Sequence, residues 1–399
     1  MAHAARPPLR IALVAPFGLR AKGTARARCL PLGKALARRG HTVALFIPPY
    51  DSPADDGRRW AEDGVAVINV ALPPGAGQGD LAQAVRQAWL GWRTYRAAAG
   101  WRPQVVHAFK PKGPSGLAAA LLWLARAMPW AGRPCLVVDS DDWEGPGGWN
   151  DDPRAAYSVP QRRFFAWQER YGLAHANAWT VASACLADRA ALFGAPPARV
   201  HVLHNGLSDF GRALLAAARG QGDDMAALLY TRFAGVRPAE VAALWAEVRA
   251  ALPEARLTVV GQGVGGEEQA LRDAPGIAVA GWREPAELPA LFARHRLAIA
   301  PWADTPANRA RHSAKVLELM AAGLPVAAYG VGELPATLGE AGVVVAPGDR
   351  AALAGAIIGL LRDPARAAEL GAAARTRVAA CFDWDALAEV ALRAYGHAE

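Results

Sequence analysis

The sequence contains few cysteines, and their spacing excludes two classes of protein. The four cysteines lie far apart and form no paired motif: Cys29, Cys135, Cys185 and Cys381. This spacing indicates neither a disulfide framework nor a zinc site. A reducing compartment suits such a chain, and we expect a cytoplasmic protein.

Long hydrophobic runs are also missing, although 53% of the residues are hydrophobic. Arg, Gly or Pro interrupts each apolar stretch well before it reaches membrane-spanning length. The start of the chain, MAHAARPPLRIALVAPFG, has a short apolar run that leads into a glycine loop, which favours a first strand over a signal peptide. No strong amphipathic anchor rich in Lys and Trp is evident, so we expect at most a peripheral contact at the inner face of the membrane.

Lysine is scarce, and the net charge of +8 is carried almost wholly by arginine. A positive excess favours anionic partners such as diphosphates or acidic lipids. The basic residues are scattered and form no run with interleaved aromatic residues. Nucleic acid is therefore not an expected partner.

The first half of the chain alternates between strand and helix patterns. Apolar runs begin at residue 10 and at residue 41, and a helical segment that ends near Gly40 joins them. Such a βαβ unit implies a parallel sheet covered by helices. Further strands are predicted at 65–72, 104–109, 134–140, 178–183 and 200–206, with helices near 80–98, 115–128 and 160–175. We assign residues 1–206 to one α/β domain.

A second α/β pattern follows. Residues 207–226 carry Gly and Asp clusters and are predicted to be a linker, and residues 227–383 repeat the alternation with helices at 238–251, 285–294 and 313–323. Residues 384–399 form a closing helix. The expected fold class is α/β, with two doubly wound, Rossmann-like parallel-sheet domains that face a cleft. Ligands should lie at the carboxyl ends of the strands.

The segment SAKVLELMAAGLPVAAYGVGELP, at 313–335, carries the most specific motif. A helical carboxylate at Glu318 can accept hydrogen bonds from two ribose hydroxyls, and Gly323 can end the helix. Alone, LELMAAG would fit a surface helix capped by glycine. The whole segment resembles the nucleotide-sugar site of family 4 glycosyltransferases of the GT-B fold, because residues 318–328 follow the family's order.

The resemblance extends upstream, to LLYTRFAGVRP at 228–238. In the family, a Gly-Arg pair and a Lys five residues later grip the diphosphate. Here Thr231 replaces the Gly, Arg232 stands in the Arg position, and Arg237 replaces the Lys. Arginine keeps the charge but presents a planar fork. The alternative is two surface arginines in an arginine-rich protein.

Two further motifs fit the same family. LTVVGQG at 257–263 matches its strand and glycine loop, with Gly261 at the start of the loop. VAGW at 279–282 precedes the stretch that meets the nucleobase in relatives, which implies a donor-binding role for Trp282 and Arg283.

The pattern departs from the family at the first Glu of its acidic motif, where this chain has Ala310. Because that carboxylate normally touches the donor sugar, we expect nearby side chains of the longer loop 301–315 to replace its contacts. The candidates are Asp304, Asn308 and Lys315, and Ser313 is also assigned to donor binding. A variant active site is the preferred interpretation, and loss of activity is the alternative.

The loop after the first strand, PFGLRAKGTARAR at 16–28, offers Gly18, Lys22, Gly23 and Thr24 to an anion near a helix start. The resemblance places this loop over the donor phosphates. Its glycine spacing matches neither the dinucleotide fingerprint nor the Walker loop. A dehydrogenase or an NTPase is thereby disfavoured.

Acidic residues end the strand at 134–140, in VVDSDDWEGPGGWND. Asp141 stands where many family members carry a His, and Asp142 matches a following Asp, so both are candidate catalytic residues for orienting or deprotonating an acceptor hydroxyl. The alternatives are a turn cluster, or the metal-binding aspartate triplet of GT-A enzymes with Mg or Mn. We expect that Asp residues this close repel one another unless a cation is bound. His107, in VVHAFKPKG, is a further catalytic candidate, and a histidine at the edge of the core is an equal alternative.

The resemblance implies a bacterial-type hexosyltransferase of GT-B architecture that moves a sugar from a nucleotide-sugar donor to an acceptor, with retention and without a metal or other cofactor. Its catalytic candidates include Arg232 and Arg237. The acceptor class stays open among small molecules, glycans and lipid-linked compounds. Two alternatives to the enzyme remain, a noncatalytic GT-B-fold subunit and a sugar-nucleotide epimerase.

Overall fold

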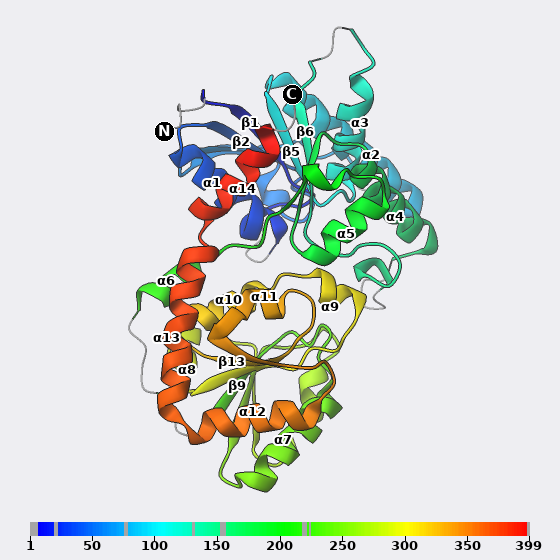
Figure 1. Ribbon diagram of the computed structural model, residues 1–399. Helices are drawn as coiled ribbons and strands as arrows, with labels where there is room; N and C mark the ends of the chain where they lie inside the picture. Colours follow the sequence, from blue (N-terminus) through cyan, green and yellow to red (C-terminus); the bar gives the residue numbers. More distant parts are fainter. Residues whose placement is uncertain are drawn as a thin grey trace. The chain divides into compact units, whose positions relative to one another are not determined.

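The computed structural model describes residues 7–19, 23–75, 79–129, 132–151, 157–217, 222 and 225–396. The chain divides into two units. Unit 1 comprises Met1–His204 and Trp384–Glu399, and unit 2 comprises Asn205–Asp383. Each unit carries its own sheet and its own helices (Figure 1).

The sheet of unit 1 has the strand order β3-β4-β2-β1-β5-β6-β7-β8. Seven of these strands run parallel: β1 (Arg10–Val14), β2 (Thr42–Ile47), β4 (Val65–Asn69), β5 (Val105–Phe109), β6 (Cys135–Ser140), β7 (Ala178–Val181) and β8 (Val200–Val202). The edge strand β3 (Arg59–Glu62) pairs antiparallel with β4. It was not predicted, because its residues are only half-buried or exposed and show no apolar run.

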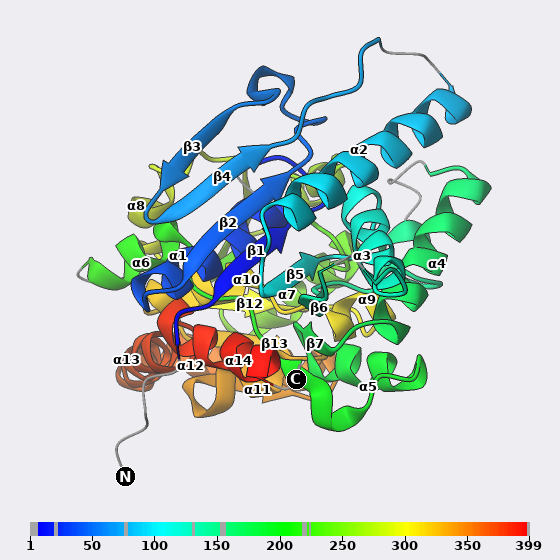
Figure 2. The ribbon, with the colours of Figure 1, turned by 90° about the horizontal axis from the view of Figure 1, so that it is seen from above.

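Helices cover both faces of this sheet (Figures 1 and 2). On one side, α1 (Leu30–Arg38) packs against α14 (Trp384–Gly396), which returns from the end of the chain. On the other side lie α2 (Asp80–Gly100), α3 (Pro114–Ala125) and α4 (Val159–Ala174), and α5 (Ala184–Leu192) packs on β7 and β8. Gly40 has a φ of 86° just after α1, which confirms the predicted glycine at this helix end.

Unit 2 has a wholly parallel sheet of order β11-β10-β9-β12-β13-β14. Its strands are β9 (Ala226–Tyr230), β10 (Arg256–Val260), β11 (Ile277–Gly281), β12 (Leu297–Ala300), β13 (Val326–Tyr329) and β14 (Gly342–Val345). Its helices are α6 (Asp209–Ala216), α7 (Pro238–Ala251), α8 (Leu288–Phe292), α9 (Pro306–Ala310), α10 (Ala314–Ala321), α11 (Leu334–Leu338), α12 (Arg350–Arg362) and α13 (Pro364–Cys381). The two doubly wound α/β units confirm the predicted fold class.

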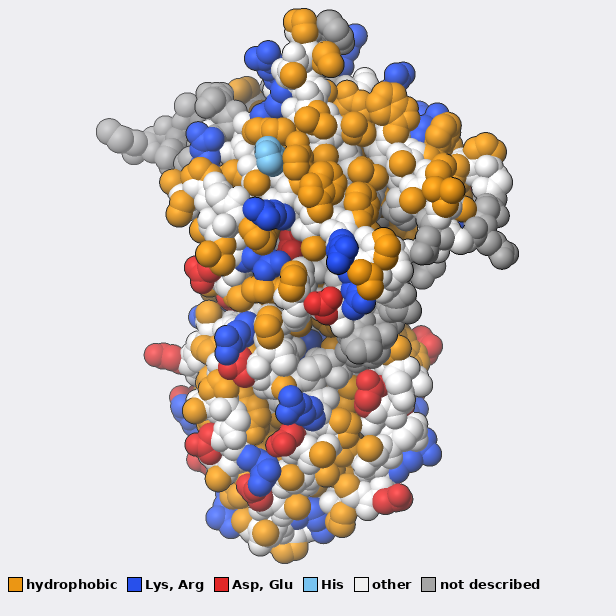
Figure 3. Space-filling model, turned by 90° about the vertical axis from the view of Figure 1, so that its right-hand side faces the viewer, with side chains coloured by type: hydrophobic (Ala, Val, Ile, Leu, Met, Phe, Trp, Pro, Cys, Tyr) orange, Lys and Arg blue, Asp and Glu red, His pale blue; other side chains and the backbone are white. Residues whose placement is uncertain are grey.

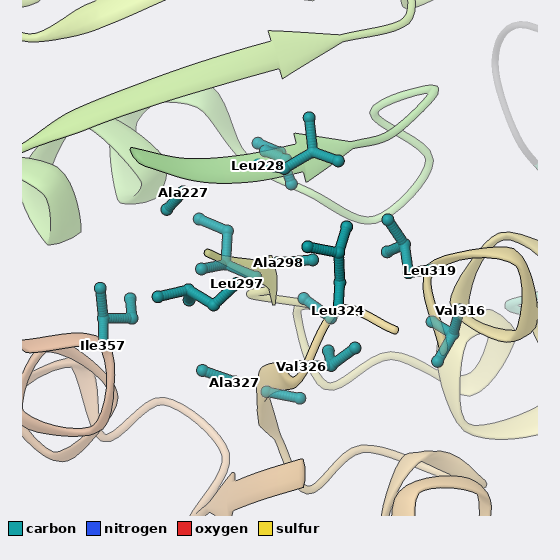
Figure 4. Packing of buried hydrophobic residues seen from close by; sticks show 14 of the residues in the cluster. Ala227, Leu228, Leu297, Ala298, Val316, Leu319, Leu324, Val326, Ala327 and Ile357 are labelled. Atoms are coloured by element: carbon teal, nitrogen blue, oxygen red, sulfur yellow. The ribbon is translucent and has the colours of Figure 1, made fainter. Parts of the chain in front are cut away.

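The core of unit 2 holds the site-bearing strands in place. Figure 4 shows Leu228 of β9, Leu297 of β12 and Val326 of β13 gathered between the flanking helices. Val316 and Leu319 of α10 pack onto this cluster, and both are buried. The apolar side of α10 therefore fixes the helix that carries Glu318.

The prediction of a linker at residues 207–226 is wrong in part. Residues Asp209–Ala216 form α6, which packs against α10, and β9 begins at Ala226. Ser208 caps α6, because its Oγ accepts a hydrogen bond from Gly211 N at 3.0 Å. Buried Leu214 anchors the helix to unit 2.

Within the described ranges, the chain has no helix that combines the length and the apolar character needed to cross a bilayer.

Candidate functional site

The predicted donor-binding residues follow adjacent strands of unit 2. Arg232 comes just after β9, Gly261 directly after β10, and Trp282 directly after β11, while β12 leads into the loop with Asp304. Since all six strands are parallel, these carboxyl ends form one edge of the sheet. One edge of one unit thus carries most of the donor residues.

Tyr230, the last residue of β9, joins three of the predicted side chains. Its hydroxyl hydrogen-bonds to Glu318, and burial together with this carboxylate raises the pKa of Tyr230, whereas Arg232 opposes the rise. Lys315 Nζ lies 4.1 Å from the centroid of the Tyr230 ring, a cation–π contact. Ser208 Oγ donates to Glu318 Oε1 at 3.1 Å. We call Ser208, Tyr230, Arg232, Lys315 and Glu318 the donor cluster.

Neither Tyr230 nor Ser208 was predicted. Tyr230 ends an apolar strand and reads as a core residue, and Ser208 reads as the start of a linker. No sequence motif marks either residue, so only their contacts in the structure identify them as part of the site. Glu318 itself is half-buried on α10, and its burial and partners differ from those of a solvent-facing surface residue.

The loop between β9 and α7 is shaped by its own side chains. Thr231 Oγ1 accepts a hydrogen bond from Phe233 N at 2.9 Å, which closes a turn in which Phe233 has a φ of 57°. Thr231 therefore fills the family's Gly position with a conformation that a side chain tolerates. The loop ends at Arg237, an exposed side chain at the N-cap of α7.

Asn308 supports this loop and is buried. Its Nδ2 donates to Gly235 O at 3.2 Å and to Ala303 O at 2.6 Å. Only 2% of the residue is exposed. Asn308 thus ties the loop that carries Arg232 and Arg237 to the loop after β12.

Gly261 is required by a close approach. It has a φ of 111°, and a Cβ built on it would lie 1.9 Å from Thr231 O. No larger residue fits here without moving the end of β9.

Trp282 and Arg283 are not brought to the donor cluster. Trp282 is 48% exposed, and its Nε1 lies 3.5 Å from Glu284 Oε1. Arg283 forms an ion pair of 3.5 Å with Glu287. They follow β11, which lies two strands from β9.

Of the side chains proposed to replace the missing Glu, only Lys315 joins Glu318. Asp304 pairs with Arg309 at 2.5 Å, and the hydrogen bond from Arg309 lowers the pKa of Asp304. Ser313 stands at the N-cap of α10 but its side chain makes no cap hydrogen bond. Ala310 has no exposed surface, so the position of the family's first Glu lies inside the fold.

In unit 1, the glycine loop meets the acidic loop. Thr24 Oγ1 donates to Asp141 Oδ2 at 3.0 Å, which joins the segments after β1 and β6. Gly18 N donates to Asp51 Oδ1 at 2.7 Å, and Gly23 O accepts from the first turn of the following helical segment. Lys22 lies outside the described residues.

The acidic loop is neutralised by lysines of the chain itself. Lys110 Nζ lies 2.6 Å from Asp142 Oδ2 and 2.8 Å from Glu144 Oε1, and Lys112 Nζ lies 2.7 Å from Glu144 Oε2. Burial lowers the pKa of Lys110, but Asp141, Asp142 and Glu144 outweigh it and raise that pKa well above its usual value. The sequence predicted that these acids repel one another unless a cation is bound, and lysines of the chain itself supply the positive charge.

Asp142 is an acid of this loop whose pKa is raised. Burial raises the pKa of Asp142, and Lys110 acts against this rise. Trp149 Nε1 donates to Asp142 Oδ1 at 3.1 Å. Lys110 holds a left-handed φ of 48°, a conformation that non-glycine residues rarely adopt and that often occurs at functional sites.

His107 lies in the core of unit 1. Its ring has no exposed surface, with Nδ1 3.0 Å from Tyr395 Oη and Nε2 2.9 Å from Thr180 Oγ1. Thr180 has one hydroxyl proton and donates it to Asp139, so Thr180 Oγ1 accepts a hydrogen bond from His107 Nε2. The other ring nitrogen, Nδ1, then accepts a hydrogen bond from the Tyr395 hydroxyl. Burial, with a contribution from Arg28, lowers the pKa of His107 well below its usual value. This geometry fits the core alternative.

Asp139, the first acid of the triplet, is also committed to the core. Arg28 Nε and Nη2 donate to its two oxygens at 2.8 and 2.7 Å. Among the side chains that the structure describes, no group of three or more His, Cys, Asp or Glu is arranged to hold a metal ion.

A pocket of about 650 Å³ opens in unit 1 near the ends of β1, β2 and β5. Five aromatic rings line it together with parts of α2, α3 and α4: Phe17, Tyr50, Tyr157, Phe164 and Phe165. Lys112 also lines it, with Nζ 4.7 Å from the Tyr157 ring centroid. No sequence motif marks this aromatic pocket, because its rings come from four separate segments.

Comparisons with known proteins cover both units. Residues 23–206 match the model of a glycosyl transferase 4-like domain, and residues 239–363 match the model of glycosyl transferases group 1. The chain is 28% identical over 390 residues to the glycogen synthase of Mycobacterium tuberculosis, which covers 91% of this chain and 88% of that protein.

Solved structures share the fold. Sucrose-phosphate synthase from Thermosynechococcus elongatus superposes with a TM-score of 0.66 at 20% identity, over 97% of this chain and 98% of that one. The catalytic domain of starch synthase IV from Arabidopsis thaliana, bound to ADP and acarbose, gives a TM-score of 0.67 at 15% identity, over 98% and 99% of the two chains.

Proposed function

The chain belongs to the family 4-like glycosyltransferases of GT-B fold and is a hexosyltransferase, and from this premise we propose that its donor is a nucleoside-diphosphate sugar. In this proposal the sugar passes to an acceptor hydroxyl with retention of configuration and without a metal ion. The observation that carries the proposal is the donor cluster, in which Lys315 and Glu318 contact Tyr230 and Arg232 acts on the same side chain electrostatically.

The proposal assigns the leaving diphosphate to the loop between β9 and α7. Negative charge builds on the diphosphate as the glycosidic bond breaks, and fixed donors aimed at that charge lower the barrier most. Arg232 and Arg237 are exposed at this loop, and Arg237 stands at the N-terminus of α7, where the helix dipole favours anions. Guanidinium groups at these positions supply the positive charge that a metal supplies elsewhere.

Glu318 is assigned to the ribose. A carboxylate has about four lone-pair positions, and Ser208 and Tyr230 each occupy one. The remaining positions can accept the two ribose hydroxyls while the protein partners keep the carboxylate oriented. Lys315, held against the Tyr230 ring, is assigned to the donor sugar or its phosphate in place of the missing first Glu.

The acceptor is assigned to unit 1. Asp141 and Asp142 lie at the carboxyl end of β6, and burial raises the pKa of Asp142, which favours its assignment as the group that exchanges a proton with the acceptor hydroxyl. The aromatic pocket lies at the ends of neighbouring strands and is large enough for a sugar or an amphipathic acceptor.

The replacement Arg232→Ala tests the assignment of the leaving group. We expect kcat to fall about 100-fold or more, the range seen when one preorganised charge donor is removed, with an unchanged fold because Arg232 is exposed. Release of nucleoside diphosphate from UDP-, ADP- and GDP-hexoses, with glycan and lipid-linked acceptors, gives the rate. Proton NMR of the product gives the anomeric configuration.

The matched control is Arg272→Ala, an exposed arginine of unit 2 in the segment between β10 and β11, which should leave kcat unchanged. An Arg232→Ala enzyme with the wild-type rate would refute the assignment. Conversion of the donor to an epimer in the absence of acceptor would favour the epimerase instead, and activity abolished by EDTA would refute metal independence.

A further inference from the structure

The outer face of α2 is hydrophobic although it faces solvent. Four large apolar residues are exposed there by 80%, 62%, 40% and 45%: Leu81, Val85, Trp89 and Trp92. Their spacings of four, four and three residues put them on one side of the helix. The opposite side packs against α3. A surface helix normally shows a polar outer side, so this stripe requires an explanation.

The hydrophobic surface continues onto the neighbouring helices. Val159 and Trp167 of α4 are 50% and 46% exposed, and α3 together with the turn after it adds Leu124 and Met128, exposed by 59% and 47%. The helices α2, α3 and α4 pack side by side on the same side of the sheet. In Figure 3 hydrophobic side chains gather over the upper part of the view, where unit 1 lies. We call these eight residues the α2–α4 face.

The charges along α2 after its first residue have one sign. Residues 81–100 contain three arginines and neither Asp nor Glu. Arg93 and Arg96 lie beside the exposed tryptophans, with Cζ 5.8 Å from the ring centroid of Trp89 and 5.7 Å from that of Trp92. On α4, Arg163 and Arg170 alternate with Val159 and Trp167 along one side.

We propose that the α2–α4 face docks on the surface of an anionic lipid bilayer. Tryptophan rings favour the level of the headgroups, because they combine a large apolar body with an N–H donor. Exposed Leu, Val and Met side chains gain by entering the acyl boundary, and the arginines beside them pair with anionic headgroups.

Other occupants fit these residues less well. A neutral glycan would stack on the tryptophans but would use neither the aliphatic side chains nor the arginines. A second copy of the same face would bring like charges together, which opposes association. Nucleic acid would pair with the arginines but not with Leu81 or Val85. A docked face would also bring an acceptor carried by the bilayer next to the aromatic pocket, because α2 and α4 form part of its wall.

Sedimentation of the full chain with vesicles tests this proposal. We expect binding to vesicles of phosphatidylcholine mixed with phosphatidylglycerol, weaker binding to phosphatidylcholine alone, and a blue shift of the tryptophan emission on binding. The double replacement Trp89→Ser/Trp92→Ser should lower the partition coefficient by about tenfold or more. Arg93→Gln/Arg96→Gln should weaken binding to the anionic vesicles, and added salt should do the same to the wild type.

Val85→Ser and Val264→Ser form a matched pair, because both valines are exposed, by 62% in α2 and by 69% in unit 2. Only Val85→Ser should weaken vesicle binding. Absence of binding to anionic vesicles, or equal loss in both valine variants, would overturn the proposal. So would a dimer, measured by light scattering, that the tryptophan replacements dissociate, because the face would then cover a second copy. Vesicle binding does not require transferase activity, so its failure leaves the proposed function untouched.

Discussion

Ser208 and Tyr230 decide how the Glu318 carboxylate is presented. The Ser208 hydroxyl accepts a hydrogen bond from Gly211 N, which caps α6, and donates a hydrogen bond to Glu318. One hydroxyl therefore stabilises both the start of α6 and the orientation of a site residue. Tyr230 adds a hydrogen bond and a ring face for Lys315. The sequence pointed to Glu318 and Lys315 through a family motif. It could not point to their partners, since these contacts join residues more than 80 positions apart in the chain.

The same limit applies to Lys110 and Asp142 in unit 1. Asp142 was a candidate from the sequence, but its ion pair with Lys110 joins loops after two different strands, β5 and β6. The sequence indicated that the clustered acids require a cation, and only the fold shows that Lys110 supplies it.

His107 makes a testable contribution to the pH dependence of stability. Its pKa is lowered well below 6.5 in the folded protein, so the unfolded state binds a proton more readily. The stabilisation is therefore present above about pH 6.5 and is lost as the pH falls below it, with a slope of about 1.4 kcal/mol per pH unit for one proton.

We expect His107→Gln to lower stability at pH 8 and to flatten the dependence between pH 6.5 and 5, as measured by urea unfolding at several pH values. The control His175→Gln, at a half-buried position on the end of α4, should keep the wild-type slope. A wild-type slope in His107→Gln would show that the buried ring does not take up a proton on unfolding.

At the scale of elements, strong periodic patterns were predicted well. The helix predicted at 238–251 is α7 with the same bounds, and Gly323 ends α10 as expected, with a φ of 76° and hydrogen bonds from Gly323 N to Met320 O and from Leu324 N to Leu319 O. The short helix α6 and the edge strand β3 were missed. Both are brief, and tertiary contacts more than local pattern stabilise them.

The exposed apolar side of α2 was not predicted from the sequence. An anchor rich in Lys and Trp is not evident there, and this helix carries Trp with Arg. The apolar residues of α2 lie on two opposite sides of the helix, and such a pattern is typical of a helix that is buried on all sides. Only the exposed fractions of Leu81 and Val85 separate the packed side from the open one.

The close contact between β9 and β10 gives a prediction at this scale. Gly261→Ala would place a methyl group 1.9 Å from Thr231 O, in addition to the strain of a φ of 111°. We expect a loss of about 2–4 kcal/mol of stability, together with weaker donor binding, because the end of β9 carries the loop with Arg232.

Gly348→Ala is the matched control, since Gly348 has a φ of 80° but nothing within 4 Å of its added Cβ. Gly348→Ala should lower the free energy of unfolding only by the backbone strain, about 1 kcal/mol. Thermal and urea unfolding of both variants separate clash from strain. Equal losses would contradict the role given to the β9–β10 contact.

At the scale of the whole molecule, the chain builds two α/β units, each with a hydrophobic core. The last helix, α14, belongs to unit 1 and packs against α1, although it follows unit 2 in sequence. The donor cluster lies within unit 2, and the acidic loop and the aromatic pocket lie within unit 1. In the proposed function, the donor and acceptor sites are thus divided in the same way as the fold.

This arrangement makes nucleotide binding the central claim, because the guanidinium groups of the β9 loop and the carboxylate of α10 must act on one ligand. Isothermal titration with UDP, ADP and GDP measures it directly. We expect the wild type and Arg272→Ala to bind one nucleoside diphosphate with the same affinity, and Arg232→Ala and Glu318→Ala each to bind it about tenfold or more weakly. If none of the diphosphates binds, or if all four proteins bind with equal affinity, the donor site is not where the fold and the family motif put it.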